Sequence, residues 1–562
     1  MLDGNTIQRD RRMPFQRKEI LLLLSFLALL FAVNYRLLAE WFMIDDTAMI
    51  FCSGFDTIKL LFDKGTYLYF NQLFFTPLLP ISFKIDWYLF QMNPAGYHLH
   101  NLLAAWLCCV LLYIFFRNYL TPFFGWLGVM LFAISLPVSF DIGWITRKHY
   151  LWGFFFALVA VHLFRQWEHD RKPSKIILSL VCTLISLLFK EAYAVLPLFV
   201  FLLATGSPVV RMRKSAFFLI VLVTYLLWRL YVLGSMGGYP GFSDASLLML
   251  SEKILAIPFD LSRSLFGMWF LPIALMLLIG VFDIRAALLT GVAAYMVMLP
   301  FIFSPAEGFL MANKALAFTA VISFMVAYLV QSGQRKNKWM AVAFIAVFYI
   351  PVFVGAFSKT LAGQEVVVKL AKNFEKISNV LMESKNRKVL IISNYAYYFS
   401  NLEDIYRNML KQDFPVCRAL SSTVGLPYLD MNDFDTIILA ENFDLLPGKA
   451  AESSVTVLRN SESEEFLQDA LSRKQLSPEP KVLFTPHDDY LRITIHDTRK
   501  GIYMRCLHMG SYVGCSPIPK DYTFRYNTVK KIQKIDVIYV DGENRESKPA
   551  TFENFRQKNI HE

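Results

Sequence analysis

The chain has 562 residues, of which 55% are hydrophobic, 15% aromatic and only 18% charged, with a formal net charge of +11. Soluble proteins carry about 25% charged residues, and a mean hydropathy of +0.41 indicates much apolar surface that does not face water. These values exclude a soluble multidomain enzyme, a disordered chain and a fibrous protein as descriptions of the whole. Many of the cations lie in short loops between apolar runs, where such residues set the orientation of the helices in a membrane. We therefore expect no nucleic-acid partner.

The N-terminal segment 1–19 is basic and precedes an apolar run at 20–38. A secretory signal would have a shorter run followed by a small-residue cleavage site. The run is long enough to span a bilayer and further apolar runs follow it. We therefore predict a first transmembrane helix with a cytoplasmic N-terminus.

Further apolar runs predict the rest of a transmembrane domain over 20–357, with about eleven helices in all. If every run crosses, the basic loops 165–175, 211–214 and 335–338 lie on the side of the N-terminus, as the positive-inside rule requires. The odd number of spans places the C-terminus outside. The runs lie at 97–116, 122–140, 150–166, 175–189, 191–205, 215–233, 263–282, 286–303, 315–331 and 339–357.

Lys190 and Glu191 separate two of these runs. Two charges at the middle of a bilayer cost several kcal/mol, whereas they cost little at the outer ends of two helices. We therefore predict a helical hairpin with these residues at its outer turn.

The composition becomes polar after residue 358, which predicts a linker at 358–385 and a soluble α/β domain at 386–562. Strands are expected at 388–393, 435–440 and 490–496, with a helix at 401–411, and this alternation favours a βαβ unit over a sandwich. The segment 487–490 is interpreted as a turn rather than a metal site. Cys506 and Cys515 form a disulfide or stay free; the sequence favours neither.

Charged residues gather in the loops that the topology places outside. Asp45 and Asp46 begin the first outer loop, 39–96, and the loop 141–150 carries cations on the side where the positive-inside rule disfavours them. With Lys190, Glu191, Glu307 and Lys314 they suit a substrate with phosphate on a lipid tail, because cations hold phosphate and a carboxylate activates an acceptor. The alternatives are a solvated helix cap for the acidic pair and surface ion pairs for the rest.

The chain resembles the polyprenyl-phosphate-dependent membrane glycosyltransferases of the GT-C class, above all the branch of the protein O-mannosyltransferases and the tetratricopeptide-repeat O-mannosyltransferases. The likeness covers roughly residues 20–330, and its motifs occur in the family's order. The matching segments are IDD at 44–46, 76–103 with the NPAGYHLHN stretch, GWITRKHYLWGFFF at 143–156, LLFKEAYAVLPLFV at 187–200 and AEGFLMANKAL at 306–316.

The resemblance implies a role for each matching residue. Asp45 is the catalytic base and Asp46 supports it, while the cations contact the lipid phosphate. The remaining polar residues bind substrate or organise the loops, and His98 is assigned to loop organisation before proton exchange. The phosphate-binding residues are Arg147, Lys148, Lys190 and Lys314, and the organising or substrate-binding residues are His98, Asn101, His149, Glu191 and Glu307.

The chain departs from the family in three respects. Relatives commonly have an arginine where this chain has Thr76, before Pro77-Leu78, and a second arginine where it has Gly308. A lysine such as Lys314 replaces a bidentate guanidinium only in part. No 34-residue periodicity is present; the C-terminal α/β domain stands where that branch has its repeats.

The sequence thus predicts a polytopic α-helical, GT-C-like membrane enzyme with a C-terminal soluble α/β domain. It would move a sugar by inverting displacement from a polyprenyl-phosphate carrier to a hydroxyl of a protein, lipid or glycan on the outer face. The alternatives are a non-catalytic or transport protein for lipid-linked sugars and a polysaccharide ligase or polymerase. The expected location is a bacterial inner membrane with the C-terminal domain in the periplasm. The sugar, the acceptor and any divalent metal ion stay undecided.

Overall fold

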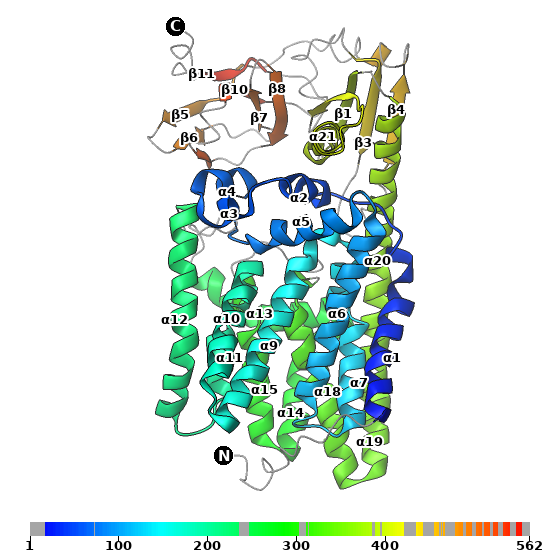
Figure 1. Cartoon of the computed structure of the whole chain (residues 1–562), viewed down its shortest axis with the longest axis vertical. Coiled ribbons are helices and arrows are strands. Elements are labelled where there is room, and N and C mark those ends of the chain that lie inside the picture. Colours follow the sequence, from blue (N-terminus) through cyan, green and yellow to red (C-terminus); the bar gives the residue numbers. More distant parts are fainter. Residues whose placement is uncertain are drawn as a thin grey trace. The chain divides into compact units, whose positions relative to one another are not determined.

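The fold is given by a computed structural model of the chain (Figure 1). It describes residues 17–71, 74–234, 247–302, 311–312, 314–384, 388–393, 396–420, 434–441, 454–459, 462, 465–466, 478–486, 490–496, 502–508, 511–517, 521–525, 532–539 and 547–553.

The chain divides into two compact units, each built from segments distant in sequence. The first comprises Met1–Glu40, Leu73–Leu79 and Leu89–Val367, and the second comprises Trp41–Gln72, Pro80–Tyr88 and Val368–Glu562. The first outer loop therefore belongs mostly to the same unit as the C-terminal domain.

The first unit is a bundle of apolar helices that run side by side (Figure 1). Its helices are α1 (Arg17–Asn34), α6 (Pro94–Phe116), α7 (Pro122–Ala133), α8 (Leu136–Gly143), α9 (Lys148–Asp170), α10 (Pro173–Phe189), α11 (Leu196–Leu203), α12 (Pro208–Leu233), α13 (Leu247–Phe266), α14 (Leu271–Phe282), α15 (Ile284–Met296), α16 (Leu299–Ile302), α18 (Leu316–Lys336), α19 (Lys338–Phe344) and the first part of α20 (Ile350–Glu383).

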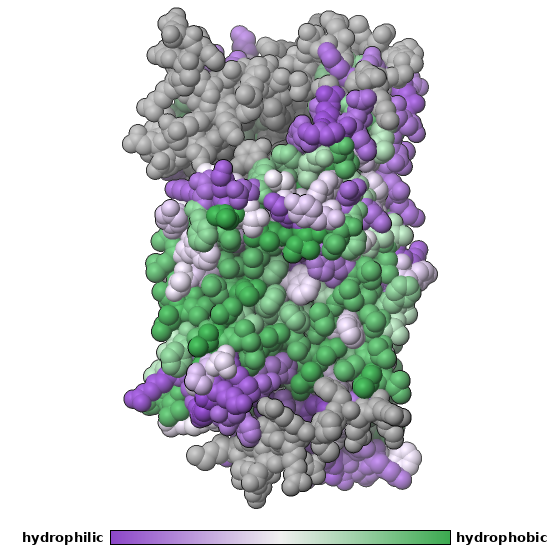
Figure 2. Space-filling model, viewed as in Figure 1, coloured by the Kyte–Doolittle hydropathy of each residue, from purple (hydrophilic) through white to green (hydrophobic). Residues whose placement is uncertain are grey.

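On the face that Figure 2 shows, hydrophobic residues cover the middle of this bundle and hydrophilic residues gather at its lower end. Within the described residues, 5 helices are long and apolar enough to cross a membrane, or up to 7 if each of two bent pairs is one span. Three shorter apolar helices accompany them: Pro173–Phe189, Glu191–Leu203 and Ile284–Met296. The chain has the character of a helical membrane protein, but the predicted number of spans is not reproduced by these helices.

Two predicted spans are bent helix pairs. The run at 122–140 consists of α7 and α8, which meet at 52°, and the run at 263–282 lies across the break between α13 and α14, where the bend is 100°. Gly267 lies at this second break with φ +76, a conformation that only glycine adopts without strain. Hydropathy averages over such breaks, so it does not reveal them.

The segment 358–385, predicted as a linker, is helical as far as Glu383 in α20. Its apolar residues recur at helical spacing, and Val367, Leu370, Phe374 and Leu381 are buried. The polar residues between them lower the mean hydropathy without interrupting the helix.

Hydrogen bonds between side chains tie the helices of the first unit together. Gln364 of α20 donates to the Asn34 Oδ1 atom at 3.2 Å and to the backbone oxygen of Val33 at 2.9 Å. Ser139 of α8 donates to the same Asn34 oxygen at 2.5 Å. Such buried hydrogen bonds stabilise helix packing in a membrane, because lipid tails are as apolar as the helices and no hydrophobic effect drives the helices together.

The second unit contains short helices from the first outer loop, of which α2 contacts α21 of the C-terminal domain. These elements are α2 (Asp46–Cys52), α3 (Thr57–Phe62), α4 (Lys64–Phe70), most of α5 (Leu78–Phe90) and α21 (Ala396–Asp404). The strands are β1 (Lys388–Ser393), β2 (Val416–Leu420), β3 (Thr436–Glu441), β4 (Ser454–Arg459), β5 (Val482–Pro486), β6 (Tyr490–Ile495), β7 (Ile502–His508), β8 (Ser511–Pro517), β9 (Asp521–Arg525), β10 (Ile532–Tyr539) and β11 (Ala550–Glu553).

The strands form three sheets, in the orders β2-β1-β3-β4, β11-β10-β7-β8 and β5-β6-β9. In the first sheet β1 pairs in parallel with β2 and β3, as a βαβ unit requires. The other two sheets pair antiparallel, and Ile493 of β6 packs in one buried cluster with Val537 of β10. The C-terminal region therefore combines an α/β part with packed antiparallel sheets.

The cysteine pair and the turn at 487–490 fall largely outside the described residues. The backbone register places Cys506 opposite Val513 and Cys515 opposite Arg505. The side chains of both cysteines are not described, so the disulfide and the free thiols both stay open alternatives. Residues 487–489 are likewise not described.

Candidate functional site

The NPAGYHLHN stretch forms the start of α6. Asn93 caps the helix by accepting a hydrogen bond from the backbone N–H of Ala95 at 3.2 Å, and Pro94 takes the first helical position. Gly96 lets α6 approach Phe90, since a Cβ atom at this position would lie 2.2 Å from the Phe90 ring. Each of these residue types is explained by the local structure that it forms.

His98 and Asn101 hold the turn that follows α8. The His98 Nδ1 atom lies 2.9 Å from the backbone oxygen of Ile142, and its Nε2 atom lies 3.1 Å from that of Glu40. Asn101 donates to the backbone oxygens of Asp141 and Ile145 at 2.9 and 3.2 Å. These contacts fit the predicted loop-organising role, because both side chains bind backbone and are fully buried.

A buried ion pair lies within this turn. The Arg147 Nε atom lies 2.6 Å from the Asp141 Oδ1 atom, and the two side chains are 5% and 0% exposed. The guanidinium also lies over the rings of Phe140, Trp144 and Tyr150, with 4.8 Å to the centroid of Tyr150. The Asp141 Oδ2 atom is buried and has no hydrogen-bond partner among the described residues.

A second charged group forms where α10 ends. Lys190 has an extended backbone between α10 and the turn Glu191–Tyr193, as the predicted hairpin requires. Its Nζ atom lies 3.5 Å from the Glu191 Oε1 atom, and Arg229 of α12 lies 3.9 Å from the same oxygen. Like the Asp141 Oδ2 atom, the Glu191 Oε2 atom is buried without a hydrogen-bond partner in the described part of the chain.

The two charged groups meet around Tyr150. The Lys190 Nζ atom lies 5.1 Å from the Tyr150 ring centroid, which Arg147 also covers. Lys314, just before α18, interacts electrostatically with Arg147, Lys190 and Glu191. We call Arg147, Lys190, Arg229, Lys314, Asp141 and Glu191 the cation cluster.

Burial lowers the pKa of Lys314 from 10.5 to about 7. The charges of Arg147 and Lys190 lower this pKa further, whereas Glu191 raises it. Four cationic side chains thus share two carboxylates in a poorly solvated region, and one of the cations loses its proton near neutral pH. Within the cluster the cations outnumber the carboxylates, and guanidinium and ammonium groups bind anions such as phosphate.

The other predicted site residues that the structure describes have structural contacts, and His149 also interacts electrostatically with Arg147, Lys190 and Lys314. The fully buried Lys148 packs its Nζ atom over Tyr97, 5.3 Å from the ring centroid. His149 donates a hydrogen bond from Nδ1 to the backbone oxygen of Thr146 at 2.7 Å. Glu307 and Gly308 lie outside the described residues. Thr76 is buried, 3% exposed.

Asp45 and Asp46 belong to the second unit. Asp46 is fully buried at the start of α2, and its Oδ2 atom accepts a hydrogen bond from the backbone N–H of Met43 at 3.0 Å. Asp45 is partly exposed. Ile44 precedes it with φ +48, a left-handed conformation that is strained for a β-branched residue and is typical of functional turns. The acidic pair thus has one structural and one accessible carboxylate.

The sequence analysis missed Arg229 and assigned no role to Asp141. Arg229 lies within the apolar run 215–233. An unpaired arginine inside an apolar span costs free energy, so its presence there indicates a buried partner and a candidate site. This was the signal in the sequence that could have revealed Arg229. Its partner Glu191 lies far away in sequence, so the pairing itself was not predictable.

The described residues contain no group of three or more His, Cys, Asp or Glu side chains that could hold a metal ion. No family model and no curated protein matches the sequence. Among solved structures, the chain is similar to an oligosaccharyltransferase from Archaeoglobus fulgidus tethered to an acceptor peptide, with a TM-score of 0.46, 11% identity and coverage of 80% of this chain and 74% of that chain. It is also similar to ArnT from Cupriavidus metallidurans, with a TM-score of 0.39, 10% identity and coverage of 75% and 92%. At these values the likeness alone establishes neither the fold nor an activity.

Proposed function

We propose that the chain is a membrane glycosyltransferase of the GT-C class, which transfers a sugar from a polyprenyl-phosphate carrier to an acceptor hydroxyl. The observation that supports this proposal is the cation cluster, which lies within a bundle of apolar helices. A lipid-linked phosphate is the anion that combines a charged group with a tail suited to such a bundle. The motif resemblance to the O-mannosyltransferase branch supports the same class of donor.

In this proposal the cation cluster binds the donor phosphate and stabilises the charge that grows on it as the sugar leaves. Arg147 offers a planar guanidinium that suits phosphate oxygens, and Asp141 fixes its orientation. Lys190 and Lys314 supply point charges. Arg229 holds Glu191 in place, and the buried Glu191 Oε2 atom is available to a sugar hydroxyl.

Asp45 is the proposed general base. It removes the proton of the acceptor hydroxyl while that oxygen bonds to the anomeric carbon, and the bond from this carbon to the phosphate oxygen breaks on the opposite face. The electron pair of the breaking bond leaves with the lipid phosphate. One displacement of this kind inverts the anomeric configuration.

The first test measures binding of a polyprenyl-phosphate sugar to the native chain and to Lys190→Met in detergent. We expect Lys190→Met to weaken binding about 10- to 100-fold, because a charge-assisted hydrogen bond to phosphate contributes about 1.5–3 kcal/mol. Lys338→Met, at the exposed start of α19, is the matched control and should bind as the native chain does. Absence of binding by the native chain, across a panel of such donors, would contradict the proposed function.

Donor binding should also depend on pH through Lys314. The pKa of about 7 means that Lys314 is mostly charged at pH 6 and mostly neutral at pH 8. A bound phosphate favours the charged form, so affinity is highest below pH 7 and falls as pH rises through 7, by about tenfold between pH 6 and 8. A phosphodiester donor is the right probe, because its charge is constant over this range.

The control for this dependence is Lys314→Arg, whose guanidinium stays charged at every pH used. We expect its affinity curve to be flat between pH 6 and 8, while that of Lys314→Met should be flat and weaker. A native curve that is flat, or an Arg variant that keeps the native slope, would show that Lys314 does not titrate on binding.

A further inference from the structure

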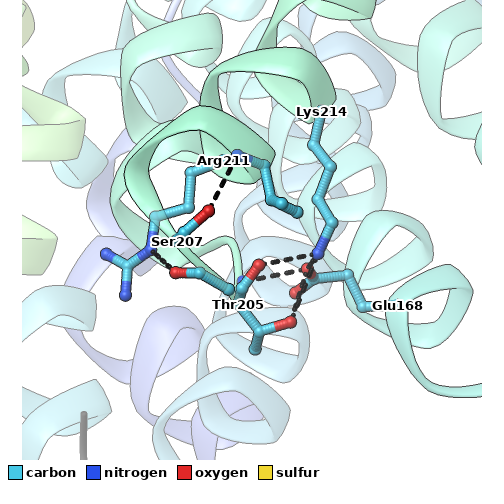
Figure 3. Close-up of polar contacts among 7 residues, drawn as sticks. Glu168, Thr205, Ser207, Arg211 and Lys214 are labelled. Atoms are coloured by element: carbon cyan, nitrogen blue, oxygen red, sulfur yellow. Dashed lines mark hydrogen bonds and ion pairs between the residues drawn. The ribbon is translucent and has the colours of Figure 1, made fainter.

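Two turns at one end of the first unit are locked together by a buried ion pair. The Lys214 Nζ atom of α12 lies 2.5 Å from the Glu168 Oε1 atom of α9 and donates to the backbone oxygen of Thr205 at 2.8 Å (Figure 3). Thr205 donates to the same Glu168 oxygen from its backbone N–H at 2.9 Å and from its Oγ1 atom at 3.0 Å. These contacts join the turn between α9 and α10 to the turn between α11 and α12. We call the two segments, residues 167–178 and 205–217, the basic turn pair.

The carboxylates of the basic turn pair are already engaged within it. Glu168 pairs with Lys214, and Asp170 pairs with Lys175 and accepts a hydrogen bond from the backbone N–H of Lys172 at 3.3 Å. The two segments contain no other Asp or Glu. Any further cation in them lacks an acidic neighbour in its own segment.

Three arginines of the basic turn pair form no ion pair among the described residues. The Arg211 Nε atom donates to the backbone oxygen of Gly206 at 3.0 Å, which holds the guanidinium at the surface (Figure 3). The Arg171 guanidinium lies over the Trp167 ring, 5.2 Å from its centroid. Arg213 is exposed. The ion pair of Glu168 with Lys214 brings the segments that carry these three guanidinium groups to the same end of the first unit, where they attract an anion that accepts several hydrogen bonds, such as a phosphate.

Apolar side chains are exposed among these arginines. Met212 is 62% exposed and lies between Arg211 and Arg213, and Val209 is 54% exposed one turn earlier. On α10, Ile177 of the other segment is 60% exposed. A soluble anion would make no favourable contact with these apolar side chains. An amphiphile can bind the arginines with its headgroup and contact the apolar residues with its chains.

We propose that the basic turn pair is a binding site for the phosphate headgroup of an anionic phospholipid. It is separate from the cation cluster, shares no residue with it and does not depend on the proposed transferase activity. The ion pair of Glu168 with Lys214 is its scaffold, and Arg171, Arg211 and Arg213 are its phosphate ligands. One bound lipid would then contact both the helix pair α9–α10 and the helix pair α11–α12.

The test titrates fluorescent phosphatidylglycerol into the full chain in neutral detergent. The variant is Arg211→Gln with Arg213→Gln, and the control is Arg335→Gln with Lys336→Gln, which removes equal charge from the exposed end of α18. At about one kcal/mol for each cation, we expect the variant to bind about thirtyfold more weakly and the control less than about threefold more weakly. Both are surface changes, so heat stability should stay near that of the native chain.

Three results would overturn the proposal. Equal losses in the variant and the control would mean that only overall charge attracts the lipid. If the native chain binds fluorescent phosphatidylcholine as tightly as phosphatidylglycerol, the negative charge of the headgroup does not contribute to binding. Displacement of the lipid by glycerol phosphate or heparin at the same concentration as phosphatidylglycerol would point to a soluble anion or polyanion as the ligand.

Discussion

Sugar transfer should fall by about a thousandfold in Asp45→Asn, with donor affinity unchanged. A general base contributes about 10²- to 10⁴-fold to a rate, and an amide cannot accept the acceptor proton. Asp45 is the accessible member of the acidic pair and follows Ile44, whose left-handed backbone is held by the reciprocal hydrogen bonds of Met43 and Asp46. The measurement is transfer of radiolabelled sugar from a polyprenyl-phosphate donor, together with donor binding on the same preparation.

The matched control is Asp46→Asn. Its side-chain oxygen can still accept the hydrogen bond from the Met43 N–H, so the turn should persist and transfer should fall much less than in Asp45→Asn. A larger loss in Asp46→Asn than in Asp45→Asn, at equal folding, would exchange the roles of the two carboxylates. Full activity in both variants would remove the acidic pair from the mechanism.

Arg147→Met should destabilise the chain by about 3–5 kcal/mol in the free energy of unfolding. The change leaves the Asp141 carboxylate, which is fully buried, without its partner, and an unpaired buried charge has this cost. The measurement is the loss of monodisperse protein on heating in detergent. Donor binding should be lost as well, because Arg147 belongs to the cation cluster.

The double variant Arg147→Met with Asp141→Asn separates the two effects. Removing both charges should restore most of the heat stability, since no buried charge stays unpaired. Donor binding should not return, because the guanidinium is still missing. If the double variant is as unstable as the single one, the packing of Arg147 on Phe140 and Tyr150 is what stabilises the turn. If it binds donor normally, Arg147 is not a phosphate ligand.

Local sequence was sufficient for several features of this protein. The apolar runs predicted where most helices lie, because hydropathy and helix length depend on neighbouring residues. The break at Lys190 was predictable from the cost of charge within a bilayer. The strands at β1, β3 and β6 were predictable from short runs of β-branched residues bounded by polar ones.

Tertiary structure alone decided which of these residues meet. Arg229 and Glu191 form an ion pair across two helices, and Asn101 reaches the turn that holds Asp141. The packing of α2 against α21 likewise joins the first outer loop to the C-terminal domain. Helix propensity and hydropathy act over a few residues, whereas these contacts depend on how whole helices pack. The sequence by itself thus determined the apolar helices and the kinds of charged residue between them, and only the packing determined the cation cluster that they form.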